Sequence, residues 1–207
     1  MGRVSVVIPG LVMCGLLVSA CSSGSSAVAA KAVSVRATTE SVHVGRLTEA
    51  FDTPLPADPA QAGVVAGFRT ATIVWDQSQE GLAPASRVMA YVTGDALRNL
   101  ADADVSMKRG KIVPGGTDRL FKTRVTMVSA SSATVSTCDD DSKFELVNPG
   151  TGVPDPADTA PEDQQYGFLT WQMVRQGGHW ALSAVLPVML PDPRAKPCQP
   201  LPASGRR

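Results

Sequence analysis

The chain has 207 residues, and its 19 lysines and arginines balance 19 aspartates and glutamates, so its formal net charge is zero. This length is enough for one domain with a substantial core. The charge balance argues against a nucleic-acid-binding protein, because such proteins carry an extended basic surface. The densest basic group, formed by Lys108, Arg109 and Lys111, is too short for that role and is interpreted as the solvated end of a helix. We therefore expect no nucleic-acid partner.

Residues 1–20 have the pattern of a secretory signal peptide. Arg3 supplies a positive charge, and the apolar run that follows is broken by proline and glycine and is marginal for a bilayer-spanning helix, which needs about 20 apolar residues. Residues 17–21 (LVSAC) resemble the bacterial lipobox, in which a lipidated cysteine becomes the new N-terminus. The alternative is an ordinary signal peptide with a stray cysteine, but the Ser- and Gly-rich residues 22–26 suit a tether behind an anchor. We expect lipid on Cys21 and a location on the extracytoplasmic face of the cell membrane.

The mature chain is expected to begin with a flexible tether, residues 21–57. This segment is rich in Ser, Ala, Thr and Val and has no sustained helical period, although a short strand around residues 33–44 is compatible with its composition. The folded domain is expected at residues 58–198, and residues 199–207 are expected to form a tail.

Cysteine usage is consistent with an oxidising compartment. Cys14 leaves with the signal peptide and Cys21 carries lipid, so Cys138 and Cys198 remain as the two thiols of the mature chain. We expect a disulfide between them, with two free thiols as the alternative. No metal site is expected, because the chain has two histidines and no Cys-x-x-Cys motif.

Three helices are predicted before any long strand. Asp58 followed by Pro59 is typical of a helix start. A second helix is expected at residues 85–92 after Pro84, and a third from Thr93 to about Gly110. The residues expected on the buried faces are Val64, Phe68, Ala71 and Trp75 in the first helix and Leu97, Leu100, Ala101 and Val105 in the third.

From residue 110 onward the pattern alternates as in β-strands. The segments 114–116 (PGG), 148–150 (NPG) and 177–178 (GG) are read as turns between runs rich in Val, Thr and aromatic residues. Strands are expected at residues 119–129, 133–139, 169–173 and 180–188, and the last two are expected to form a hairpin. The acidic segment 154–165 is expected to be a polar loop or a flexible lid. Helices followed by antiparallel strands indicate an α+β fold.

This order of parts resembles the NTF2-like, or cystatin-like, cone, in which N-terminal helices pack on a strongly bent antiparallel sheet. Residues 133–142 (ATVSTCDDDS), the turn at 151–152 and residues 178–182 (GHWAL) are similar to a largely uncharacterised group of actinobacterial lipoproteins. The resemblance implies a pocket inside the cone, where isomerase-like and cyclase-like relatives place an Asp or a His. It also implies that a homodimer through the sheet face, near Thr170 and Gln172, is one arrangement to expect.

The candidate site residues are few. Trp75, Tyr91, Trp171 and Trp180 are candidates to line a pocket, with packing in the core as the default. His179 follows the Gly-Gly turn and is expected in solvent at a hairpin tip. Residues 139–141 (DDD) are interpreted as a charged strand end, because their spacing lacks the ligand pattern of an EF-hand calcium loop.

The sequence contains no catalytic motif of the serine-hydrolase, zinc-protease or phosphate-loop kinds. We therefore assign no catalytic residue, metal or cofactor, and expect a non-catalytic binding or scaffolding module for a small hydrophobic ligand or an envelope protein. The alternative is an NTF2-like isomerase or cyclase that uses a pocket carboxylate. A buried carboxylate facing Tyr91 or Tyr166 in an apolar cavity would favour the enzyme, whereas a cavity filled by Leu and Trp side chains would exclude it.

Overall fold

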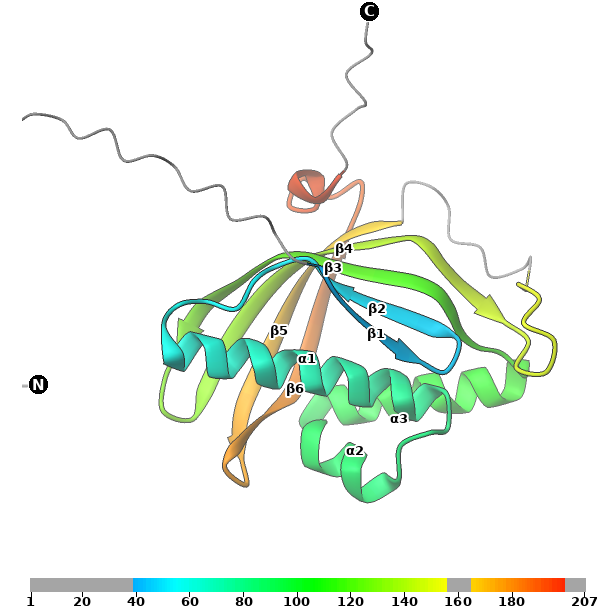
Figure 1. Cartoon of the computed structure of the whole chain (residues 1–207), viewed down its shortest axis with the longest axis horizontal. Helices are drawn as coiled ribbons and strands as arrows, with labels where there is room; N and C mark the ends of the chain where they lie inside the picture. Colours follow the sequence, from blue (N-terminus) through cyan, green and yellow to red (C-terminus); the bar gives the residue numbers. More distant parts are fainter. Residues whose placement is uncertain (1–38, 156–164, 200–207) are drawn as a thin grey trace, which may run out of the picture. The chain divides into compact units, whose positions relative to one another are not determined.

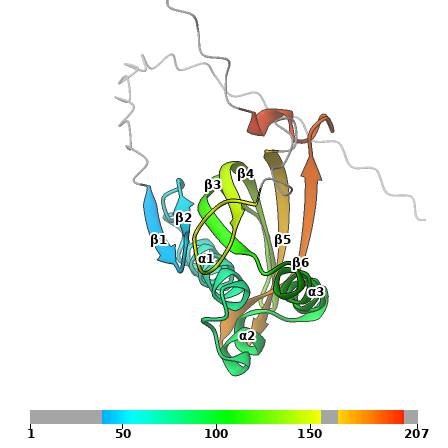
Figure 2. The same ribbon diagram turned by 90° about the vertical axis from the view of Figure 1, so that its right-hand side faces the viewer.

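The computed structural model describes residues 39–155 and 165–199. These residues form three α-helices and a six-stranded sheet in which the strands follow one another in chain order (Figure 1, Figure 2). The strands are β1 (Glu40–Val44), β2 (Leu47–Phe51), β3 (Val113–Val128), β4 (Ser132–Val147), β5 (Tyr166–Gln176) and β6 (His179–Met189). The helices are α1 (Pro59–Gln79), α2 (Ala85–Tyr91) and α3 (Gly94–Gly110), and a one-turn 3-10 helix covers Lys196–Cys198. The predicted α+β class, with helices before the long strands, is confirmed.

Helix α1 begins where the sequence predicts it. The carboxylate of Asp58 accepts a hydrogen bond of 2.8 Å from the backbone N–H of Gln61, which satisfies one of the free donors at the helix start. The helix lies across one face of the sheet (Figure 1). Its buried face includes Val64, Phe68 and Ala71, as predicted.

Helix α3 also begins as predicted, but its buried face differs from the prediction. Ala96 and Leu100 are buried, whereas Ala101 and Val105 are exposed. The start of α3 is tied to β6, because the backbone N–H of Thr93 donates to a β6 carbonyl. The first half of the helix is therefore the part that is held against the sheet.

The sheet is antiparallel except for the parallel pairing of β2 with β3. Strands β3 and β4 are 16 residues each, and their pairing contains three register shifts. Such bulges bend a sheet and increase its twist, and Figure 2 shows the sheet curving over α1. The sheet is curled without closing into a barrel, since β1 and β6 remain its edges.

The segment 114–116, predicted to be a turn, lies inside β3 instead. Gly116 has φ +76°, and a Cβ at this position would lie 2.0 Å from the carbonyl oxygen of Lys143 on β4. The glycine is therefore required by a close approach of two strands, which sequence alone does not distinguish from a turn.

The predicted tether, residues 21–57, is wrong in its second half. Residues 40–51 form the hairpin of β1 and β2, and β2 pairs with β3 along its whole length. Leu47 and Phe51 are buried, and the ring of Phe51 packs against Phe68 of α1. The strands are only five residues long and derive their stability from this pairing, so their own pattern is weak. Residues 21–38 lie outside the described part of the chain.

Two predicted turns are confirmed. Gly177 and Gly178 have φ values of +57° and +87° and join β5 to β6, as expected for a two-residue hairpin turn. After β4, the side-chain carbonyl of Asn148 accepts hydrogen bonds from the backbone N–H groups of Gly150 and Thr151. This side chain closes the turn that the Asn-Pro-Gly segment predicts.

The core lies between α1 and the sheet. The ring of Phe68 packs edge-on against Trp171 with ring centroids 5.0 Å apart, and against Phe51 at 6.4 Å. On the same helix, Gly67 lets α1 approach β6 closely, because a Cβ there would lie 2.5 Å from the Cβ of Trp180. Trp180 is accordingly buried in the core.

A disulfide joins Cys138 in β4 to Cys198 in the 3-10 helix, with Cα atoms 5.1 Å apart. This is the pair that the cysteine count predicts. The bond closes a loop with a sequence separation of 60 residues and fixes the segment that follows β6 to the sheet. Both cysteines are buried.

Candidate functional site

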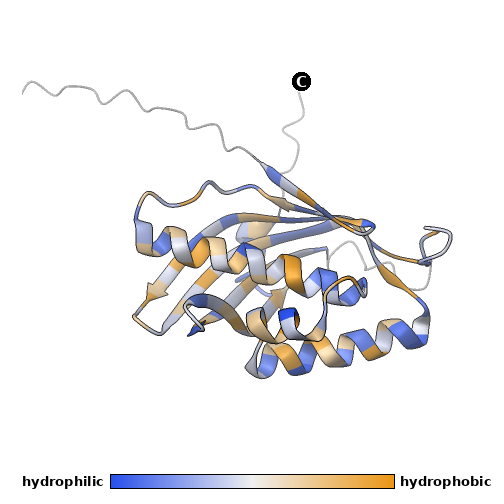
Figure 3. Cartoon of the chain, turned by 60° about the horizontal axis from the view of Figure 1, so that its bottom comes forward, coloured by the Kyte–Doolittle hydropathy of each residue, from blue (hydrophilic) through white to orange (hydrophobic). Residues whose placement is uncertain are grey.

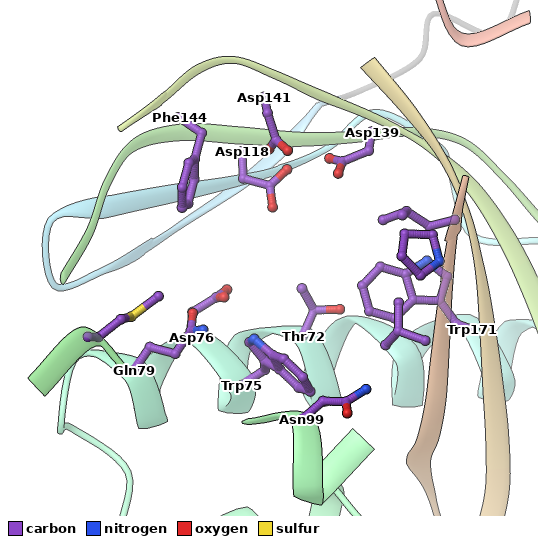
Figure 4. A pocket seen from close by; sticks show the side chains of 14 residues that line it. Thr72, Trp75, Asp76, Gln79, Asn99, Asp118, Asp139, Asp141, Phe144 and Trp171 are labelled. Atoms are coloured by element: carbon purple, nitrogen blue, oxygen red, sulfur yellow. The ribbon is translucent and has the colours of Figure 1, made fainter. Parts of the chain in front are cut away.

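A pocket of about 350 Å³ lies between helices α1 and α3 and the inner face of the sheet (Figure 4). Its size falls in the range of small-molecule sites, roughly 300–1,000 Å³. It is lined by Thr72, Trp75, Asp76 and Gln79 of α1, Asn99 and Met107 of α3, Asp118 of β3, Asp139, Asp141 and Phe144 of β4, Leu169 and Trp171 of β5, and Val185 and Pro187 of β6.

Aromatic side chains form the apolar part of the pocket. Trp75 comes from α1 and Trp171 from β5, and both are among the four candidates predicted from sequence. The indole N–H of Trp171 donates a hydrogen bond of 2.8 Å to the hydroxyl of Thr137, which fixes the orientation of the ring. Phe144 adds a third ring from β4 (Figure 4). The pocket therefore offers flat apolar surfaces to a ligand.

The other two candidate aromatic residues are not among the lining residues of this pocket. Trp180 lies in the core beside Gly67. Tyr91 packs against His179, with ring centroids 4.6 Å apart. His179 is half-buried rather than free in solvent, and its Nε2 lies 2.7 Å from the carbonyl oxygen of Ala90. The expectation that His179 stands in solvent is thus wrong, because α2 covers this end of the β5–β6 hairpin.

Three aspartates meet on the sheet side of the pocket. Asp139 and Asp141 are two residues apart on β4, so they point to the same face of the sheet. Asp118 on β3 is brought opposite Asp141 by the register shift between residues 117 and 119. One carboxylate oxygen from each of the three lies within 4.8 Å of the others. Figure 4 shows all three carboxyl groups pointing into the pocket.

Two further carboxyl groups adjoin this group. Glu49 on β2 is the direct partner of Asp118 in the parallel β2–β3 ladder and is fully buried, with 0% of its surface exposed. Asp76 on α1 is 6% exposed and lines the pocket from the helix side (Figure 4). Like charges on directly opposite residues of a sheet are destabilising. The site therefore concentrates negative charge in a way that folding alone does not favour.

Several oxygens of these carboxyl groups are buried without a hydrogen-bond donor from any described residue. They are both oxygens of Glu49 and one oxygen each of Asp76, Asp118 and Asp139. Buried polar groups are normally satisfied, so an unsatisfied cluster calls for a specific explanation. In this site the missing partners can be protons shared between the carboxyl groups or a bound molecule.

The burial of these five carboxyl groups raises their pKa values. Burial is the main cause that raises the pKa of Glu49, Asp76 and Asp139 well above the ordinary values of carboxyl groups, and neighbouring carboxylates contribute. Burial also raises the pKa of Asp118, and it raises the pKa of Asp141 to about 7. Part of the cluster is therefore protonated at neutral pH when nothing else neutralises it.

No arginine, lysine or histidine is among the residues that line the pocket. The nearest basic residue on β3, Arg119, is directed to the other side of the sheet, where it forms ion pairs with Asp52 and Asp140. Asp140 lies between Asp139 and Asp141 in sequence and points away from them, as alternation along a strand requires. The positive charge of this arginine thus lies outside the pocket.

The interpretation of residues 139–141 as a charged strand end is therefore wrong. The triplet lies in the interior of β4, and Asp139 is only 7% exposed. Alternation within the triplet was the available sequence indication, since a strand passing through it turns at least one of the three carboxylates to each face of the sheet. Glu49, Asp76 and Asp118 stand alone in sequence, and no sequence feature pointed to them.

Other predicted features lie partly or wholly beyond the described residues. The acidic segment 154–165 is described only at its ends, and the signal peptide with Cys21 lies in residues 1–38. Tyr166, the other tyrosine considered from sequence, pairs with Asp140 at the start of β5 and is not among the lining residues of this pocket. Neither tyrosine is therefore part of the lining that holds the carboxyl groups.

The chain has a low similarity to several solved structures. No protein-family model matches the chain, and no curated protein sequence matches it. Among solved structures, the intermembrane-space region of the chloroplast protein ARC6 is 12% identical, with a TM-score of 0.44, and the match covers 65% of this chain and 99% of that one. Aln2 from a Streptomyces species is 14% identical, with a TM-score of 0.41 and coverages of 66% and 94%.

A domain with a cystatin-like fold from Nostoc punctiforme is 11% identical, with a TM-score of 0.36, and the match covers 64% of this chain and 78% of that one. The structure itself has the α+β arrangement expected from sequence, with N-terminal helices packed on an open, curled sheet. Similarity at this level says nothing about what the pocket binds.

Proposed function

We propose that this protein is a lipid-anchored extracytoplasmic binding module whose pocket takes a small ligand with a flat apolar body and a basic group. The observation that carries the proposal is the division of the pocket into two parts. Trp75, Trp171 and Phe144 supply flat apolar surfaces, while the carboxyl groups of Asp76 and Asp118 face the same space. An amine would give these carboxylates a charged partner, which none of the residues that line the pocket provides.

The ligand class is narrower than the small hydrophobic ligand expected from sequence. A purely apolar molecule would leave the buried carboxylates without a partner, and an acidic one would add to their repulsion. Apolar surfaces and a few convergent polar groups are the usual composition of a small-molecule site. The pocket therefore favours an aromatic or alicyclic amine.

Binding can be tested with three probes that share one ring system. Isothermal titration of the full chain, purified in a non-ionic detergent, is expected to show binding of 1-naphthylmethylamine and at least tenfold weaker binding of 1-naphthylmethanol and 1-naphthoic acid. Asp76→Asn should weaken amine binding, whereas Asp102→Asn, at an exposed position of α3, should not. Equal affinity for the three probes would contradict the proposed role of the carboxylates.

The membrane anchor rests on the lipobox-like residues 17–21 and the following Ser- and Gly-rich segment. No helix in the part of the chain that the structure describes is long and apolar enough to cross a membrane, and polar residues are interspersed along each of its helices (Figure 3). Replacing Cys21 with Ser is expected to abolish labelling by radioactive palmitate and to leave the precursor uncut. Continued labelling of the variant would refute lipidation at this cysteine.

A second candidate function is acid–base catalysis by Asp76. This carboxyl group is almost fully buried, lines a pocket with aromatic walls and has a raised pKa, as in isomerases that move a proton next to a carbonyl group. Its test is the conversion of 3-cyclohexenone to the conjugated isomer, followed by ultraviolet absorbance. Turnover that is lost in Asp76→Asn and retained in Asp102→Asn would establish this activity, and absence of turnover would leave the binding role alone.

A further inference from the structure

The strongest unexplained feature of the pocket is the group formed by Asp118, Asp139 and Asp141. Each residue offers one oxygen, and these oxygens lie within 4.8 Å of one another. Calcium binds carboxylate oxygens at about 2.3–2.6 Å, so two ligands on opposite sides of one ion are separated by up to roughly 5 Å. The spacing thus matches ligands around a single calcium ion.

Burial supplies an independent indication that the group faces a cation. Asp76, which is not one of the three, is 6% exposed, is aimed into the pocket from α1 and has an oxygen without a donor among the described residues (Figure 4). Glu49, the direct neighbour of Asp118 in the β2–β3 ladder, is fully buried. Neither of its carboxylate oxygens has a hydrogen-bond donor among the described residues. Two carboxyl groups that are more than nine-tenths buried, and that have oxygens without a hydrogen-bond donor, thus lie next to three convergent aspartates. Together these groups indicate a site of strongly negative potential.

The backbone places the three ligands on a rigid element. Asp139 and Asp141 belong to one strand, and the bulge opposite residue 118 sets Asp118 beside them. Bulges often occur where a strand must redirect a side chain at a functional site.

We propose that Asp118, Asp139 and Asp141 bind one calcium ion at the sheet side of the pocket. Carboxylates that coordinate through one or both oxygens supply three to six of the six to eight ligands that calcium prefers, and water entering from the pocket can supply the rest. This revises the expectation from sequence that the chain has no metal site. The inference does not depend on the amine ligand. The five carboxyl groups can carry more negative charge than the two positive charges of one calcium ion, so a bound calcium ion does not exclude an amine.

Terbium(III) is a suitable first probe, because it replaces calcium at oxygen sites and its luminescence is sensitised by nearby tryptophan. Trp75 and Trp171 line the same pocket. The full chain in detergent, freed of metal with EDTA and dialysed, is expected to show saturable terbium luminescence that calcium displaces. Calcium should bind at least tenfold more tightly than magnesium, which requires shorter bonds and a nearly ideal octahedron. Magnesium binding as tight as calcium binding would overturn the assignment of the ion.

The variants give a matched comparison within one strand. Asp139→Asn and Asp141→Asn are each expected to weaken calcium binding at least tenfold, because each removes a charged ligand. Asp140→Asn changes the residue between them, which points to the opposite face and pairs with Arg119, and should leave the affinity within twofold. Circular dichroism establishes that each variant is folded.

Two results would overturn the proposal. One is a folded wild-type chain that binds neither terbium nor calcium at millimolar concentration. The other is binding that is equally strong in Asp139→Asn, Asp141→Asn and Asp140→Asn, which would place the ion elsewhere. Titration with 1-naphthylmethylamine in EDTA measures the proposed amine binding separately, so failure of one proposal is distinguishable from failure of the other.

Discussion

Replacing Asp141 with Asn should make the metal-free protein more stable at alkaline pH. Burial raises the pKa of this carboxyl group from an ordinary value of 3.8 to about 7, so its charged form is disfavoured in the folded state. A group whose pKa is higher in the folded state than in the unfolded state stabilises folding at low pH and loses that contribution as pH rises from about 4 to about 7. Asparagine keeps nearly the same shape and carries no charge to be buried.

The magnitude follows from the two pKa values. One pKa unit corresponds to about 1.4 kcal/mol, so the difference between 3.8 and about 7 makes ionised Asp141 cost about 4 kcal/mol at pH 8. In EDTA, the wild type should therefore lose stability between about pH 4 and about pH 7 relative to Asp141→Asn. At about pH 3 and below, where the carboxyl group is mostly protonated in both states, the two proteins should be similarly stable.

The measurement is urea unfolding of the full chain in detergent and EDTA, followed by tryptophan fluorescence at a series of pH values. Asp102→Asn is the control, because Asp102 is exposed on α3 and its replacement should change the free energy of unfolding by no more than about 0.5 kcal/mol. If Asp141→Asn has the same pH dependence as the wild type, or is less stable at pH 8, the carboxyl group is not held in a buried environment that disfavours its charge.

Two glycines of α1 give opposite expectations for the same substitution. Gly63→Ala should stabilise the protein by up to about 1 kcal/mol, since no atom lies within 4 Å of the added Cβ and alanine favours a helix. Gly67→Ala should destabilise it, because its Cβ would lie 2.5 Å from Trp180, and a thermal denaturation series that ranks Gly67→Ala above Gly63→Ala would contradict this packing. For the disulfide, the double replacement of Cys138 and Cys198 with Ser should reduce the free energy of unfolding by about 4 kcal/mol for a loop of this length, whereas unchanged stability would mean that the cross-link does not constrain the unfolded chain.

The acidic pocket depends on a local irregularity of the sheet. Regular pairing of β3 and β4 through residues 117–119 would place Asp118 opposite one residue of β4, but the register shift sets it against two, Asp141 and Ser142. The side chain of Ser142 bonds to Asp140 on the other face, which leaves Asp141 beside Asp118. A single extra residue in one strand thus brings together the two carboxyl groups that share this end of the pocket.

The order of elements was determined by the sequence itself. The cap at Asp58, the break at Pro84 and the glycine pair at residues 177–178 each act through local backbone chemistry, so the three helices and the last hairpin could be predicted. The cysteine pair was predictable by counting, because the predicted signal peptide and lipid anchor account for Cys14 and Cys21 and leave Cys138 and Cys198 as partners. Trp75 and Trp171 were identified as pocket candidates for their size and amphipathic rings, though not distinguished from Tyr91 and Trp180.

The tertiary structure alone decided where the carboxylates meet. Glu49, Asp76 and Asp118 come from a short edge hairpin, a helix and a strand, and their proximity is produced by the parallel β2–β3 pairing and by α1 packing under the sheet. The strand β2 gains its stability from β3, so its own five residues carry too weak a pattern to reveal it. Local chemistry specifies elements because it acts between near neighbours in sequence, whereas this site is made by contacts between residues that are far apart in the chain.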